Sequence, residues 1–398
     1  MALLAVGCLP GERALPPEEA LDRAAAGIET LVQRDEALRE SGAVSPQRDG
    51  STRNGGAVSV WTYAHPLISP LAGGSEAVTA FNARHDGFAL RVRSLGDWRA
   101  AVQKLTVGLA SGALPDIAVV KRAWMAQLID SGQLIRLDDL LEPDFLDALY
   151  TTAKAHYTRN GRLYGLPADG FCSVLMYNRD KLPGKPPSDW SELRKVASEL
   201  AHNNGHPIGH MPYIEALWSA GGCVWEDGGL RGAAAPEAMT FLLELRGAGL
   251  VHPRAMTNPA HGLALLQHGR TAMTVAPSYW TPRVQRSDIN LGFAAVPGCC
   301  GPISRGHDAA IVVFAHSQAG ESAIREVLEF LTGPVVQGAK AVELGSHPVR
   351  RDVAETIAIP EGLRAAYANV RSVPLTPSLS AIEHELDRRL RQAYRWGG

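Results

Sequence analysis

Residues that could do chemistry are present in the chain, but few of them stand at the spacing that a reaction needs. His202, His206 and His210 fall four residues apart, which on one helix would turn three imidazoles to the same face. The Asn, Gly and Pro residues between them disfavour a helix, so we expect no metal site there. Nucleophile-elbow, phosphate-loop, zinc-protease and dinucleotide-binding motifs are missing from the sequence. We therefore predict no catalytic residue, no metal and no cofactor.

Aromatic side chains are more informative, because they fall at the ends of expected strands and at the starts of loops. Aromatic rings pack against the C–H faces of sugars, while Asp, Asn, Arg and His bind the hydroxyls. For Trp124 and Trp218 alone, packing in a core is the simpler explanation. As one set, these residues favour a cleft for a small polar ligand: Trp61, Tyr63, Trp124, Phe171, Tyr213, Trp218, Tyr279 and Trp280.

The elements that would position these side chains alternate between strand and helix. Strand-forming and helical patterns follow one another at 57–61, 77–81, 88–92, 97–109 and 114–120. This order predicts an α/β fold with a mainly parallel sheet covered by helices. Ligands of such sheets lie beyond the carboxyl ends of the strands, which here means the loops after Trp61 and Val120.

The later chain shows helix starts and further buried strands. Asp189 and Asn258 are placed to cap helices, and Ser317 is expected to cap another. Buried strands are predicted at 271–275 and 309–314. A last amphipathic helix is predicted from about 377 to 394.

The stretch 160–178 has the features of a connection between two lobes. An Asn-Gly pair near its start allows a tight turn with positive φ. Pro167 cannot donate to a ladder, so it belongs at a strand end or a sheet edge. The small residues 168–170 form a pliable corner before the apolar run 174–177, which suits a covered strand. We expect a Gly170→Pro substitution to weaken lobe closure more than it lowers stability.

Composition places the chain among soluble globular proteins. Its 398 residues are enough for two lobes, and the apolar fraction of 45% and charged fraction of 20% are ordinary. A formal net charge of -2 gives no reason to expect nucleic acid as a partner. No run approaches the roughly 18 apolar residues needed to span a bilayer.

Residues 1–56 differ in composition from the body. The first eight resemble the lipid-attachment signal of a bacterial lipoprotein, with Cys8 as the modified residue, although the basic segment is missing and the apolar run is short. A helix to about residue 39 and a Gly-rich linker follow. The alternatives are a chance cysteine in a loose end, and a helix packed on the body.

The remaining cysteines are Cys172, Cys223, Cys299 and Cys300, without any CxxC spacing. Pairing of Cys172 with Cys223 is conceivable in an oxidising compartment. Free buried thiols are the simpler expectation.

Several motifs in order carry a family resemblance. They are VSVWTY, SGALPDIAVV, NGRLYGLPADGFCSVLMYN, GRTAMTVAPSYW and LEFLTGPVVQGAKAVELGSHPVRRDV. From about residue 57 to 394 the chain resembles bacterial extracellular solute-binding proteins of the sugar-type class, the class that includes maltose-binding protein. The resemblance implies a type II periplasmic-binding-protein fold, in which two lobes are joined by crossover hinges and each holds a mostly parallel sheet with flanking helices. It divides the chain into lobe one, 57–168 with 307–350, and lobe two, 169–306 with 351–398.

The resemblance also implies ligand contacts, carried over motif by motif. The predicted ligand-binding residues are Tyr63, His65, Arg122, Trp124, Asp169, Phe171, Tyr213, Tyr279, Trp280, His307, Asp308 and Glu383. The sequence departs from maltose-binding protein at several aromatic and acidic contacts, so maltose itself is not assumed.

The function implied is that of a monomeric receptor in the cell envelope. It would bind a small solute, with a carbohydrate preferred, and deliver it to ABC-importer permeases by hinge closure. The alternatives are a ligand-sensing accessory of a membrane signalling partner, or a binder of a polyamine or other solute. A hydrolase using Asp169 and Asp308 is a further rival, and would need the two carboxylates about 5–10 Å apart.

Overall fold

The computed structural model describes residues 56–63, 76–96, 98–220, 225–226, 229–230, 234–256, 258–281, 284, 288–299, 301–306 and 309–371. The expected leader helix and the expected last helix lie outside these residues. Within the described part of the chain, no helix has the length and apolar character needed to cross a membrane.

The first sheet has five strands in the order β2-β1-β3-β12-β6. These are β2 (Ala89–Ser94), β1 (Ala57–Thr62), β3 (Ile117–Lys121), β12 (Ala309–Val313) and β6 (Leu166–Pro167). β1 runs parallel to both β2 and β3, as the alternation of strands and helices predicts. β12 returns from much later in the chain and pairs antiparallel with β3 and β6.

The second sheet has the order β10-β7-β11, made of β10 (Met273–Pro277), β7 (Ser173–Asn178) and β11 (Leu291–Ala294). Both pairings of β7 are antiparallel, so the expectation of a mostly parallel sheet is wrong for these three strands. Ile208, outside the named strands, forms single parallel bridges to Val251 and to Met273 of β10. The partners of β7 come from segments far along the chain, so no βαβ crossover fixes their direction.

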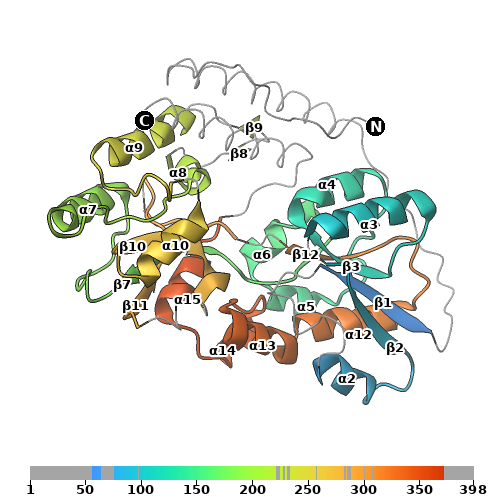
Figure 1. The fold of residues 1–398 in the computed structure, drawn as a ribbon. Coiled ribbons are helices and arrows are strands. Elements are labelled where there is room, and N and C mark those ends of the chain that lie inside the picture. The colour runs from blue at the N-terminus through green and yellow to red at the C-terminus, as the bar shows by residue number, and fades with distance from the viewer. Residues whose placement is uncertain are drawn as a thin grey trace.

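Helices cover both sheets, and Figure 1 shows the two sheets side by side. With the first sheet lie α2 (Glu76–Asn82), α3 (Trp98–Ser111), α4 (Arg122–Asp130), α5 (Pro143–Ala148), α6 (Thr151–Ala155) and α12 (Glu321–Thr332). With the second lie α7 (Trp190–Asn204), α8 (Tyr213–Ala220), α9 (Ala234–Gly247), α10 (Pro259–Gln267) and α15 (Glu361–Ala368). α13 (Pro334–Leu344) and α14 (Arg351–Glu355) lie between α12 and α15 at the bottom of the view. The short elements are the β4 (Thr158–Arg159) and β5 (Arg162–Leu163) pair, the β8 (Trp225–Glu226) and β9 (Gly229–Leu230) pair, and the 3-10 turn η2 (Ser278–Trp280).

Local signals in the sequence set several of these boundaries. The Asp189 side chain accepts a hydrogen bond from the Glu192 amide at the start of α7, and Asn258 caps α10 in the same way. Asn160, with φ 51°, and the glycine after it, with φ 73°, turn the chain between β4 and β5. Pro167 lies on β6 at the edge of the first sheet. These predictions are confirmed.

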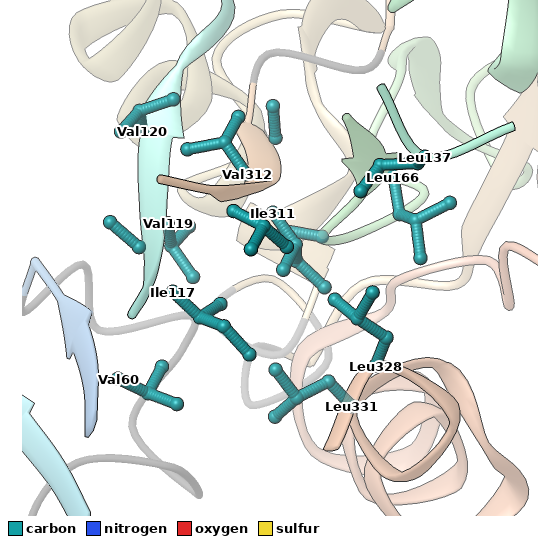
Figure 2. Close-up of a cluster of buried hydrophobic side chains, with 14 of the residues drawn as sticks. Val60, Ile117, Val119, Val120, Leu137, Leu166, Ile311, Val312, Leu328 and Leu331 are labelled. Atoms are coloured by element: carbon teal, nitrogen blue, oxygen red, sulfur yellow. The ribbon is translucent and has the colours of Figure 1, made fainter. Parts of the chain in front are cut away.

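A large apolar core fills the space between the first sheet and its helices. Figure 2 shows side chains from β1, β3 and β12 gathered near those of α12, with Val120 and Val312 farther from that helix. The labelled residues are Val60, Ile117, Val119, Val120, Leu137, Leu166, Ile311, Val312, Leu328 and Leu331. All ten are less than 10% exposed, so this core is the main apolar stabilisation of lobe one.

Strand β7 separates two further cores in the second lobe. Leu175 and Tyr177 pack on one side with residues of α7, α8 and α9. Val174 and Met176 pack on the other side with residues of α10 and α15. The continuous apolar run in the sequence therefore reflects a strand that is covered on both faces.

Asp116 ties three separate segments of lobe one together. The amide and hydroxyl of Ser59 donate to its Oδ2 at 2.8 and 2.7 Å, and the Ser317 hydroxyl donates to its Oδ1 at 2.6 Å. Ser317 therefore does not cap α12, whose N-cap residue is Gly320. Burial opposes ionisation of Asp116, but these hydrogen bonds outweigh it and hold its pKa below the ordinary value.

We predict that an Asp116→Ala variant loses about 2–3 kcal/mol of unfolding free energy, because hydrogen bonds to a charged group are removed. In the unsubstituted protein this contribution is present above about pH 4 and is lost as the pH falls through the lowered pKa. Urea unfolding at several pH values measures both effects. An Asp86→Ala variant at an exposed position is the control. Equal stability of the two variants at neutral pH would contradict the prediction.

Candidate functional site

The chain first crosses between the two sheets through residues 168–173, which we call the crossover. At its start the Ala168 amide donates to the Ala309 carbonyl at 3.0 Å. In the middle the Gly170 amide donates to the Ser346 hydroxyl at 3.1 Å. At its end the Ser173 amide donates to the Arg305 carbonyl at 2.6 Å. The crossover is thus held by two later parts of the chain, 305–309 and the turn at Ser346.

Three predicted aromatic residues come together at the end of the crossover. The ring of Phe171 meets that of Tyr279 edge to face, with centroids 5.3 Å apart. Tyr279 meets Trp280 in the same manner at 5.7 Å. Phe171 is 8% exposed, and the other two rings are half-buried. Partly exposed rings in this arrangement offer faces on which a ligand with C–H groups can pack.

A polar pair that the sequence did not single out lies at the same place. The Ser173 hydroxyl donates to the Glu215 carboxylate, which is 4% exposed in the first turn of α8. Tyr213 begins the same helix, and burial raises the pKa of its hydroxyl. The signal in the sequence was an acidic residue inside the otherwise apolar run YIEALW. A buried carboxylate with a hydroxyl beside it is suited to binding polar groups of a ligand.

Asp169 lies inside the crossover. Its side chain is 4% exposed, and its Oδ1 accepts from the Phe171 amide at 3.4 Å. Its charge acts on Lys340 of α13 and on Tyr367 of α15. This buried carboxylate therefore interacts electrostatically with groups of α13 and α15.

The predicted site residues of lobe one serve its own packing. Tyr63 is 3% exposed, with the Lys121 ammonium 5.9 Å from the centre of its ring. Arg122 is 6% exposed, and its Nε donates to the His156 carbonyl at 3.1 Å. Trp124 packs against the lobe-one core, which is the simpler explanation that its sequence position suggested. Tyr63 and Arg122 follow β1 and β3 directly, at the carboxyl ends of the parallel strands.

Other predicted positions lie outside the described residues, namely Cys8, His65, His307, Asp308 and Glu383. Cys172 is a free, buried thiol, and burial raises its pKa to about 12. The Cys299 thiol donates to the Glu237 carboxylate at 3.6 Å. The hydrolase alternative needs Asp169 and Asp308 close together, and Asp308 lies outside the described residues.

The histidines do not assemble as their spacing in the sequence suggests. α7 ends at Asn204, before His206, and the His206 and His210 rings bond to the separate carbonyls of Gly249 and Ala255. Among the side chains that the structure describes, no group of three or more His, Cys, Asp or Glu residues is arranged to hold a metal ion.

Behind the crossover lies an open pocket with about 310 Å³ of empty volume. Gly170 and Cys172 line it, whereas Asp169 and Phe171 do not. Its remaining walls come from Ser278, Ala341, Gly345, Ser346, His347, Ala358, Ile359, Pro360 and Leu363. Phe171, Tyr279 and Trp280 are therefore not among the residues that line this pocket.

An α/β protein of two lobes, with its candidate ligand groups at a crossover, is built like a solute receptor. Residues 76–365 match the family of bacterial extracellular solute-binding proteins. The chain belongs to this family. Its members are extracytoplasmic receptors, not enzymes, so the hydrolase alternative is set aside.

Individual relatives are distant. A Brucella abortus (strain 2308) protein, named only as a binding protein, is 24% identical over 280 residues, covering 64% of this chain and 67% of its own. The maltotriose-binding protein of Pyrococcus abyssi is 24% identical over 299 residues, which cover 70% of this chain and 65% of that protein. The solved sugar-binding protein MalE of Xanthomonas citri superposes with a TM-score of 0.73 at 19% identity, covering 86% and 93%. The last comparison confirms the predicted fold.

Gly170 is the position at which the crossover tolerates least change. A Cβ atom built there would lie 2.0 Å from the His347 carbonyl oxygen. Proline would add this clash to the loss of the Gly170 amide, which donates to Ser346. We therefore expect a Gly170→Pro change to lower the unfolding free energy strongly. The sequence had predicted a larger effect on lobe closure than on stability.

We predict that a Gly170→Ala variant loses at least about 2 kcal/mol of unfolding free energy, since backbone must move to admit the methyl group. Chemical denaturation of purified protein measures the loss. The matched control is Gly184→Ala, because an added Cβ at Gly184 meets nothing within 4 Å. A Gly170→Ala variant as stable as this control would show that the close approach imposes no constraint.

Proposed function

We propose that this protein binds a carbohydrate between its two lobes, at the aromatic cluster formed by Phe171, Tyr279 and Trp280. The observation that carries the proposal is the position of this cluster beside the Ser173–Glu215 pair. Ring faces suit the C–H surface of a sugar, and the carboxylate and hydroxyl suit its hydroxyl groups. Both sets of groups lie at the end of the crossover.

The names of relatives support the same ligand class. One is called a maltotriose-binding protein and another a sugar-binding protein. Their identity to this chain is below 25%, so the choice of sugar is left to experiment.

Ligand binding is proposed to act through lobe movement. Lobe one would comprise 57–168 with 307–350, and lobe two 169–306 with 351–398. The separate apolar cores on the two sides of the crossover support this division. A sugar that contacts both lobes would favour the closed form, which a pair of ABC-importer permeases would then bind. The receptor is proposed to act as a monomer.

Attachment to the membrane would use Cys8 in the lipoprotein-like leader, with residues 9–56 as the tether. The supporting observation is the run of small residues before Cys8 in the sequence. Mass spectrometry of protein from membranes would detect the diacylglyceryl group, and an unmodified leader would refute this part of the proposal.

A thermal-shift screen is the direct test of the ligand class. We predict that a sugar, among them maltose, maltotriose and arabinooligosaccharides, raises the melting temperature, because a ligand of the folded state stabilises it. At a free sugar concentration of a hundred times Kd, the free energy of unfolding rises by about 2.7 kcal/mol. Amino acids and polyamines are the comparison ligands. A shift with a polyamine and with no sugar would overturn the carbohydrate assignment.

The cluster itself is tested by substitution. We predict that Tyr279→Ala raises the Kd of the sugar that binds by about tenfold, which is the size of one aromatic contact. Trp61, which the sequence grouped with the cleft aromatics, is half-buried and packs against the lobe-one core, so a Trp61→Ala variant should keep its affinity. Calorimetric titration measures both, and equal losses in the two variants would remove the cluster from the site.

A further inference from the structure

A lysine side chain from α13 reaches the crossover through the protein interior. Lys340 is 1% exposed, and its Nζ donates to the Ala168 carbonyl at 2.6 Å. Gln337, one turn earlier on α13, directs its amide to the same carbonyl at 3.5 Å. An ammonium group is rarely buried so completely unless it has a partner of opposite charge.

Asp169, the next residue of the crossover, supplies the opposite charge that acts on Lys340. Burial lowers the pKa of Lys340 to about 8, and the charge of Asp169 limits this shift. Lys340 therefore carries its proton at pH 7 and loses it in a range where most proteins remain folded.

The pair is connected to the aromatic cluster by short steps. Asp169 accepts a hydrogen bond from the Phe171 amide, and the Phe171 ring packs on Tyr279. A change in the position of the Asp169 carboxylate is therefore transmitted to the Phe171 backbone and to the ring it carries.

Resting on the proposed function, we propose that Lys340 is a positioning residue of the ligand site. Its ammonium group holds the Ala168 carbonyl and attracts the carboxylate of the next residue, Asp169, and so sets the place of Phe171 against Tyr279. The charged form of Lys340 keeps the cluster competent to bind sugar, and the neutral form releases it. The charge-assisted hydrogen bond to Ala168 weakens at the same time.

Among the described residues, the other groups near the crossover whose pKa shifts are resolved change charge elsewhere on the pH scale. Burial lowers the pKa of His347 to about 4 and raises that of Cys172 to about 12. Burial also raises the pKa of the Tyr150 and Tyr367 hydroxyls above 10. A transition near pH 8 at the crossover therefore reports on Lys340.

The pH dependence of stability has the opposite sign to the pH dependence of affinity. The pKa of Lys340 is lower in the folded protein than in the unfolded chain, so the unfolded chain binds more protons between about pH 8 and pH 10. Titration of Lys340 thus raises the unfolding free energy as the pH rises, while sugar affinity falls. A residue with only a structural role would change the unfolding free energy in this pH range and leave sugar affinity unchanged.

A ¹⁹F NMR experiment without ligand tests the link to the cluster. 4-Fluorophenylalanine is placed at position 171, and its resonance is followed from about pH 7 to pH 9.5, where Lys340 titrates. We expect a transition near pH 8 that disappears in Lys340→Met. Lys181→Met is the control, because Lys181 also donates to a carbonyl, that of Gly269, at 2.6 Å. A resonance that stays constant, or a transition that survives in Lys340→Met, would overturn the proposal.

Affinity is tested with maltotriose as the probe. We expect its Kd to rise by about tenfold between pH 7 and pH 9.5, while Lys340→Met shows a weakened, pH-independent Kd. A double variant with Asp169→Asn removes both charges and should recover the stability lost in Lys340→Met, but not its affinity. If maltotriose does not bind at any pH, the thermal-shift screen of sugars decides the proposed function, and the ¹⁹F transition alone decides the role of Lys340. Binding with the same pH profile in Lys340→Met would overturn it.

Discussion

The crossover at 168–173 is a backbone segment with no helix or long strand of its own, yet it is buried in the interior. Buried amides and carbonyls must find partners, and here they are supplied from β12, α13, and the turns around Arg305 and Ser346. The hydrogen bonds that these groups form therefore help to set the position of one lobe relative to the other. The close approach at Gly170 follows from the same constraint, since only a residue without a Cβ lets the two backbones meet.

The two sides of the crossover differ in chemistry. Phe171 lies with Tyr279 on one side, and Gly170 and Cys172 line the pocket with Ser346 on the other. A strand-like segment places successive side chains on opposite faces, so a single short stretch can serve a ligand cluster and a packed hinge at once. Any movement of one lobe relative to the other must change these contacts.

Charge in this region is concentrated in few groups. Lys340 and Asp169 bring opposite charges into an interior where each alone would be costly. Asp116, in lobe one, is by contrast held by the neutral hydroxyl and amide donors of Ser59 and Ser317. The first arrangement responds to pH near the physiological range and the second only in acid.

Sequence alone determined the elements whose signals are local. Nearby residues determine the caps at Asp189 and Asn258, the Asn160 turn, the edge position of Pro167 and the covered strand β7. The alternation of strands and helices along the chain likewise predicts the parallel pairing of β1 with β2 and β3. Tertiary structure decided what depends on distant partners: the direction of β10 and β11 beside β7, the use of Ser317 by Asp116, and the meeting of Ser173 with Glu215. It also decided that Arg122 turns into its own lobe. Such contacts join residues tens to hundreds of positions apart, and no periodicity or spacing within one segment encodes them.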